Sequence, residues 1–272
     1  MSDPVLTLPR TVCLPFNRCN LPAVILGSLT FQRYPAPLKL DGVEELHRDL
    51  FRRLDNIPEG RRRAEIFRDY VTVHFRLEHL DEAGLTETRA GRANANYMSM
   101  IRGWYFDSNG RESAALKGWV ESRFGLAPRY HGAALREPES EAQRHYQRIQ
   151  ARTCYGTNAL ESQLDLVYAY CQYEFARTCP GTIHLTLHRG VNRLEDHELL
   201  GGSRKEPVLL LNNLNSFTGM RERAGEFGDT ILTLQVPVAK VFFHSRLLPG
   251  VLQGEAEFLV VGGVYEVESA RV

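Results

Sequence analysis

The hydrophobic pattern of this chain changes at Pro180, and that change limits the possible folds more than any other feature of the sequence. Before it, apolar residues recur at helical spacing, and the clearest stripe is Leu160, Leu164, Val167, Cys171 and Phe175. After it, segments rich in β-branched and aromatic residues alternate with Gly, Asn or Pro. These segments predict strands over 182–189, 207–218, 230–243, 256–261 and 264–268. Helices followed by strands are typical of the α+β class.

Further helices are expected upstream of the stripe helix, each marked by a capping signal or by a Gly or Pro that ends it. They are predicted over 43–54, from about 62 to 80, over 112–124 and from about 140. The capping signal of the first is Asp41–Glu44, and the second should bury Val73 and His74. Arg61-Arg62-Arg63 is interpreted as a solvated charge run.

Three regions follow from these patterns. Residues 1–40 hold six prolines and are expected to form an irregular arm laid over the body. Residues 41–180 form a mostly helical region, and residues 181–272 form a β-rich core. The three regions could also make one compact domain, since 272 residues suffice for a single large core.

Composition excludes several classes of function. Lys plus Arg and Asp plus Glu balance at 33 each, so no overall field favours nucleic acid. The absence of a long apolar run or a basic leader favours a cytoplasmic protein without membrane insertion. The five cysteines form no Cys-x-x-Cys pair, and His184 and His188 lack an evident third ligand. We therefore expect neither a disulfide framework nor a metal site.

Candidate catalytic residues lie in three strand segments. Glu255 and Glu257 are two residues apart at the start of a strand, so their side chains should point to one side of the sheet. Ser216 and Thr218 share one face of an earlier strand, and Arg189 ends another. Cleavage of a glycosidic bond passes through a cationic transition state that a carboxylate such as Glu257 would stabilise. Arg189 could hold a phosphate with its fork of donors.

Each of these features also has an ordinary structural interpretation. A Glu-x-Glu pair at a strand start is usually a solvated edge, an Arg-Gly after a strand is usually a turn, and a Ser-x-Thr on a strand is common. Their order and spacing together carry the functional interpretation.

That order resembles the Arg–Ser–Glu signature of mono-ADP-ribosyltransferases of the cholera-toxin-like class, over about residues 182–264. The resemblance implies an ADP-ribosyltransferase fold and NAD as a cosubstrate that is consumed. It implies that Arg189 holds the NAD phosphates, that the backbone of Gly190 holds the nicotinamide carboxamide, and that Phe227 stacks on the nicotinamide. Ser216 would support the catalytic Glu257, with Thr218 beside it.

The same resemblance assigns the acceptor side of the reaction. Glu255 would orient the acceptor, and a glutamate at that position goes with arginine acceptors. The loop that contacts the target would be about Leu248 to Gly254.

Over its whole length the chain resembles the dinitrogenase reductase ADP-ribosyltransferase family of nitrogen-fixing bacteria. The implied target is dinitrogenase reductase, the iron protein of nitrogenase, whose modification would switch off nitrogen fixation. The family also implies regulation by a PII-type signalling protein, and we expect a monomer. Two alternatives stay open: an NAD glycohydrolase with water as acceptor, and a non-catalytic module that senses NAD.

Overall fold

The computed structural model describes residues 7–77, 96–130, 133–134, 141, 144, 146–148, 159–194, 197–249 and 257–271. It contains helices, mostly in the first two thirds of the chain, and a large antiparallel sheet in the last third. The predicted α+β class is therefore confirmed. The division into three regions stays a prediction, although buried residues from all three belong to one hydrophobic core.

The elements follow one another in chain order. The helices are η1 (Arg10–Val12), α1 (Ala23–Leu26), α2 (Leu29–Arg33), α3 (Val43–Leu46), α4 (Arg48–Asp55), α5 (Gly60–His74), α7 (Tyr97–Phe106), α8 (Arg111–Phe124), α10 (Leu160–Thr178), α11 (Arg221–Ala224), η3 (Gly225–Phe227) and η4 (Val238–Lys240). The strands are β1 (Arg129–Tyr130), β2 (Ala133–Ala134), β3 (His184–Val191), β4 (Glu198–Gly202), β5 (Pro207–Thr218), β6 (Thr230–Pro237), β7 (Val241–His244), β8 (Glu257–Glu266) and β9 (Glu268–Arg271).

Seven strands form the main sheet in the order β7-β8-β5-β3-β6-β9, and β4 pairs with the free part of β5. All of these pairs are antiparallel. Strands β3 and β5 pair in register at His188 and Thr218, so this pair joins the two halves of the sheet. The long β5–β8 ladder places Ser216 opposite Leu259 and Thr218 opposite Glu257.

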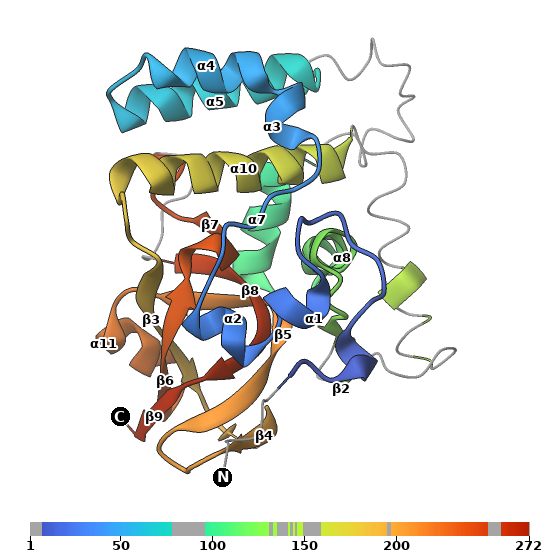
Figure 1. Cartoon of the computed structure of the whole chain (residues 1–272), viewed down its shortest axis with the longest axis vertical. Coiled ribbons are helices and arrows are strands. Elements are labelled where there is room, and N and C mark those ends of the chain that lie inside the picture. Colours follow the sequence, from blue (N-terminus) through green and yellow to red (C-terminus); the bar gives the residue numbers. More distant parts are fainter. Residues whose placement is uncertain are drawn as a thin grey trace.

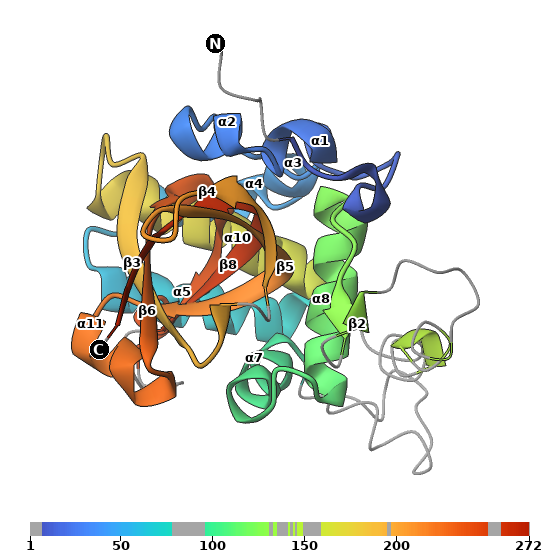
Figure 2. The same ribbon diagram turned by 90° about the horizontal axis from the view of Figure 1, so that it is seen from below.

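Figure 1 shows the layers of the molecule. Helices α4 and α5 lie side by side, and α10 lies between them and the strands, where it contacts β7. Helices α7 and α8 pack together, and α8 contacts β5 (Figure 2). The buried stripe predicted for α10 is confirmed, because Leu160, Leu164, Val167, Cys171 and Phe175 are all buried.

The N-terminal segment lies against the sheet. Helix α2 contacts β8 and β6, and Gln32 makes a reciprocal pair of hydrogen bonds with the backbone of Glu266. In that pair the side-chain amide donates at 2.9 Å and its oxygen accepts from the Glu266 amide at 2.8 Å. The arm predicted over 1–40 thus holds three short helical segments within its described part.

Three predictions about helices differ from the structure. The helix predicted over 43–54 is divided into α3 and α4 at His47, and its N-cap is Gly42, which has no side chain to complete the capping box of Asp41–Glu44. The helix predicted from 62 to 80 begins at Gly60 and ends at His74. Val73 and His74 are exposed, because the buried stripe runs through Phe67, Val71 and Phe75 and leaves them on another side of the helix. The helix opening at Ser140 lies largely outside the described residues.

The strand predictions are closer to the structure. Strand β5 has the predicted bounds 207–218, whereas the segment 230–243 is divided into β6 and β7 by η4. The two short strands expected around Gly262 are one continuous strand, β8. The partner strand has a bulge between Leu211 and Leu214, and a Cβ at Gly262 would collide with the carbonyl oxygen of Asn212. Glycine is needed there for close approach, so it continues the strand rather than ending it.

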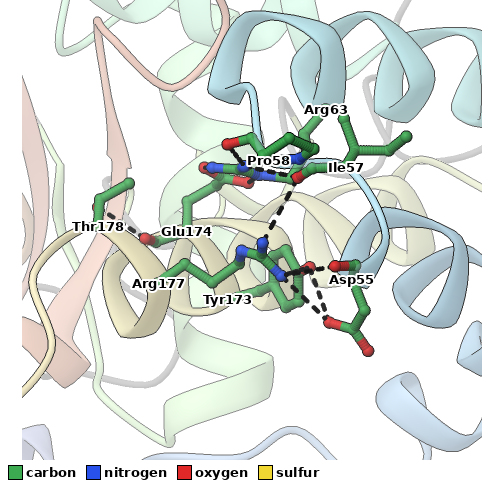
Figure 3. A network of polar contacts seen from close by, with 8 residues as sticks. All are labelled: Asp55, Ile57, Pro58, Arg63, Tyr173, Glu174, Arg177 and Thr178. Carbon is green, nitrogen blue, oxygen red and sulfur yellow. Dashed lines mark hydrogen bonds and ion pairs between the residues drawn. The ribbon is translucent and has the colours of Figure 1, made fainter.

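A buried ion pair joins helix α5 to helix α10 (Figure 3). Arg63 on α5 meets Glu174 on α10 through two hydrogen bonds of 2.6 and 2.7 Å, and its remaining nitrogen donates to the carbonyl oxygens of Ile57 and Pro58. Their side chains are 3% and 10% exposed. The prediction that the whole 61–63 run is solvated is therefore wrong for Arg63, because its partner lies on a helix that is distant in sequence.

Removing one member of this pair should destabilise the protein strongly. We expect Arg63→Met to lower the free energy of unfolding by about 3–5 kcal/mol, because it leaves the buried Glu174 carboxylate without its partner. Arg62→Met is the matched control, since Arg62 pairs with Glu65 on the surface and its loss should leave the free energy of unfolding nearly unchanged. Urea unfolding measures both. Equal losses in the two variants would show that the buried pair does not anchor the outer helices.

Candidate active site

The ends of β3 and β5 and the start of β8 lie close together at one end of the sheet, and they carry the predicted site residues. Arg189 lies near the end of β3, Ser216 near the end of β5, and Glu257 at the start of β8. The pairing of Thr218 with Glu257 and of Thr218 with His188 fixes this arrangement. The structure therefore brings together Arg189, Ser216 and Glu257, which are separated by many residues in the sequence.

Glu257 is half-buried, and its surroundings act on its charge in opposite directions. Burial raises the pKa of its carboxyl group, whereas a hydrogen bond from the Ser216 hydroxyl and the positive charge of Arg189 lower it. The burial effect is the largest of the three. A half-buried carboxylate with a hydroxyl and a guanidinium beside it can stabilise a positive charge that develops on a substrate.

Arg189 has donors left over for a ligand. Its Nη1 donates to the backbone carbonyl of Ser216 at 2.9 Å. Its Nε is buried and has no hydrogen-bond partner among the described residues. Burial lowers the pKa of this guanidinium, and the charge of Glu257 partly offsets the effect. A buried donor without a partner is costly, so this geometry fits a site that takes up an anionic or strongly accepting group such as a phosphate.

Helix α7 supplies two residues to the site that sequence reasoning missed. The indole nitrogen of Trp104 donates to the Ser216 hydroxyl oxygen at 2.7 Å. The hydroxyl of Tyr105 is buried, lacks a partner within the described parts of the chain, and lies near enough to Glu257 for its charge to raise the Tyr105 pKa.

Thr218 supports the turn that follows β5 and leads to α11. The Thr218 hydroxyl accepts from the backbone amide of Met220 at 3.2 Å and so supports the turn into α11. Gly190 packs against that same segment, because a Cβ there would collide with the carbonyl oxygen of Ala224. Phe227 follows in η3 and is 59% exposed. An exposed aromatic ring held this way is available to stack on a ligand.

The predicted acceptor side of the site cannot be placed. Glu255 and most of the predicted target loop, 248–254, lie outside the described residues. Within the described residues, no group of three or more His, Cys, Asp or Glu side chains is arranged to hold a metal ion. None of the helices described here has both the length and the apolar character that a membrane span requires.

A sheet-edge site of arginine, serine and glutamate in an α+β fold defines the class of ADP-ribosyltransferases that the sequence resembles. Residues 16–269 match the family described as dinitrogenase reductase ADP-ribosyltransferase. A curated relative from Rhodospirillum rubrum, named NAD(+)--dinitrogen-reductase ADP-D-ribosyltransferase, is 38% identical over 259 residues, which cover 93% of this chain and 94% of the relative. No solved structure matches the chain. The chain belongs to the dinitrogenase reductase ADP-ribosyltransferase family.

The close packing at Gly190 predicts a sharp effect of substitution. We expect Gly190→Ala to push the segment around Ala224 away from β3, displace Phe227 with it, and weaken NAD binding by about tenfold or more. Gly219→Ala is the matched control, because a Cβ there would meet only a ring carbon of Phe258 at an ordinary 3.6 Å. Calorimetric titration with NAD measures both. Equal affinities in the two variants would contradict a binding role for the Gly190 contact.

The raised pKa of Glu257 predicts an effect on stability as well. The folded protein holds this proton more tightly than the unfolded chain does, so ionising Glu257 costs folding free energy as the pH rises through the carboxyl range. Glu257→Gln should therefore have a Tm at pH 7 equal to or above that of the wild type. The excess of its Tm over that of the wild type should grow between about pH 4 and about pH 7. Scanning calorimetry across that range measures it, and an advantage that shrinks with pH would contradict the sign of the shift.

Proposed function

We propose that this protein transfers ADP-ribose from NAD to an arginine of dinitrogenase reductase and releases nicotinamide. The observation that carries the proposal is the meeting of Arg189, Ser216 and Glu257 at one sheet edge in a member of this family. The name of the Rhodospirillum rubrum relative supports NAD as the donor and dinitrogenase reductase as the protein acceptor. Modification of that protein would switch off nitrogen fixation.

Three residues bind NAD on the donor side of the site, and Thr218 supports them. Arg189 binds the phosphates, which the unpartnered Nε supports. The backbone of Gly190 binds the nicotinamide carboxamide, and the exposed ring of Phe227 stacks on the nicotinamide. Thr218 contributes by holding the turn that leads to Phe227.

The reaction breaks one glycosidic bond and forms another. Glu257 accepts a hydrogen bond from the 2-hydroxyl of the nicotinamide ribose, and this bond strengthens as positive charge develops on the sugar. Nicotinamide departs with the electron pair of the broken bond. A guanidinium nitrogen of the acceptor arginine then bonds to the ribose carbon and gives up a proton. Glu255 orients that guanidinium, a role that rests on the family resemblance.

The partners and setting of the protein are proposals of the same kind. We infer from the resemblance that a PII-type signalling protein regulates the activity, that the protein acts as a monomer, and that it works in the cytoplasm with its target. An NAD glycohydrolase would share every donor-side residue and would release nicotinamide without labelling protein. An NAD-sensing module would bind NAD without releasing nicotinamide.

The catalytic role of Glu257 is tested by an isosteric change. Glu257→Gln should fold and should lose both nicotinamide release and labelling of dinitrogenase reductase from labelled NAD, by at least about 100-fold. The neutral amide keeps the shape but cannot stabilise positive charge. Glu266→Gln, at the exposed far end of the same strand, is the matched control and should keep both activities. Normal transfer by Glu257→Gln would rule out this carboxylate.

The acceptor role of Glu255 separates transfer from hydrolysis. Glu255→Gln should lose arginine labelling and keep part of the nicotinamide release, because only the acceptor loses its charge-assisted partner. Comparing the two activities in one preparation measures this. Loss of both in equal proportion would place Glu255 on the donor side instead.

A further inference from the structure

Trp104 reaches the catalytic strands from a different layer of the protein. It lies on α7, is 3% exposed, and donates its only N–H to the Ser216 hydroxyl oxygen at 2.7 Å. Ser216 and Glu257 are diagonal neighbours in the β5–β8 ladder, and the Ser216 hydroxyl lowers the pKa of the Glu257 carboxyl. The indole therefore bonds to the hydroxyl that lies beside the carboxylate.

The chemistry of these three groups fixes the direction of the protons. An indole nitrogen can only donate, and an ionised carboxylate can only accept. A hydroxyl has one proton and two lone pairs, so once a lone pair accepts from Trp104 the proton is left for Glu257. The indole thereby selects the rotamer of the Ser216 hydroxyl in which it donates to the carboxylate.

We propose that Trp104 is a positioning residue for the transfer reaction, which orients the Ser216 hydroxyl toward the Glu257 carboxylate. The inference concerns the site of the proposed function and rests on it for its catalytic meaning. The hydrogen-bond chain itself can be tested without any activity.

Contacts with helix α8 hold the indole in place. The Lys117 ammonium lies 5.7 Å from the centre of the Trp104 ring and donates to the backbone carbonyl of Ser108, in the turn after α7, at 2.8 Å. Helices α7 and α8 approach so closely that a Cβ at Gly103 would collide with the side chain of Glu112. An indole clamped in this way can fix a proton position, since it loses little freedom on forming the bond.

Other charged and titratable groups also face the carboxylate and must be separated from Trp104. The charge of Arg189 on β3 lowers the pKa of Glu257, and burial together with the charge of Glu257 raises the pKa of Tyr105 on α7. Burial, with the charge of Arg189, lowers the pKa of Lys117 on α8 to about 8. Titration below about pH 7 keeps Lys117 charged and Tyr105 neutral. His188 on β3 and His244 on β7 titrate in the same range, because burial lowers their pKa, to about 4 for His244. The carboxyl signal of Glu257 itself must therefore be followed.

The test is an NMR titration of the full-length protein with ¹³C-labelled glutamate carboxyls and ¹⁵N-labelled indoles. The Glu257 signal is assigned by its loss in Glu257→Gln. The chain has two tryptophans, so Trp104→Phe and Trp119→Phe assign the two indole signals. Trp119→Phe is the matched control, because the Trp119 indole donates to Asp165 at 2.7 Å rather than to Ser216.

In the wild type the Trp104 indole signal should follow the titration of Glu257. In Trp104→Phe the Glu257 titration should move to higher pH by about half a unit to one unit, as expected when a carboxylate loses much of one hydrogen bond. In Trp119→Phe it should not move. An unmoved Glu257 titration in Trp104→Phe overturns the proposal.

A second variant covers the case in which Trp104→Phe does not fold. Ser216→Ala keeps the indole and removes its acceptor, so the Trp104 signal should shift and cease to follow Glu257. A Trp104 signal that still follows Glu257 in this variant overturns the proposal.

The pH dependence of nicotinamide release distinguishes a positioning role of Trp104 from a purely structural one. The acidic limb of nicotinamide release should shift in Trp104→Phe by the same amount as the titration, with KM for NAD unchanged. Coupled titrations in a wild type that releases no nicotinamide would leave the hydrogen-bond chain intact and refute the proposed function instead.

Discussion

The pairing of β5 with β8 is the constraint on which the site depends. The ladder sets Thr218 opposite Glu257, and this register brings the Ser216 hydroxyl to the carboxylate. A slip by one residue would turn Glu257 to the other face of the sheet. The bulge on β5 and the close approach of Gly262 to Asn212 oppose such a slip, because the bulge fits only opposite a residue without a side chain. A backbone feature far from the chemistry thus holds the catalytic group in place.

The helices complete what the sheet begins. Helix α10 packs against the sheet and is joined to α5 by the Arg63–Glu174 ion pair. Helix α7 reaches the site through the hydrogen bond from Trp104 to Ser216. Among the described residues, two of the six buried side-chain atoms without a hydrogen-bond partner, Arg189 Nε and the Tyr105 hydroxyl, lie near the reacting carboxylate. Elsewhere the buried charged groups Arg63 and Arg123 are paired with carboxylates. Polar groups left without partners at a site are costly to folding and become useful when a polar substrate binds.

The sequence alone predicted much of this arrangement, for identifiable reasons. Strand β5 was predicted with its bounds because a run of Val and Leu follows Pro207 and a glycine follows Thr218. Arg189, Ser216 and Glu257 could be recognised because each lies near a strand end. Helix α7 was missed, since ten mostly apolar residues with a glycine inside carry little helical periodicity. The partners of Trp104 and Arg63 are distant in sequence, and no local pattern encodes such contacts.

A crystal structure of Glu257→Gln with NAD bound tests whether Arg189, Ser216 and Glu257 form one NAD site. We expect the diphosphate on Arg189, the nicotinamide against Phe227 and Gly190, and the 2-hydroxyl of the nicotinamide ribose within hydrogen-bond distance of residue 257. NAD bound at another edge of the sheet, or with its adenosine end at residue 257, would contradict the account.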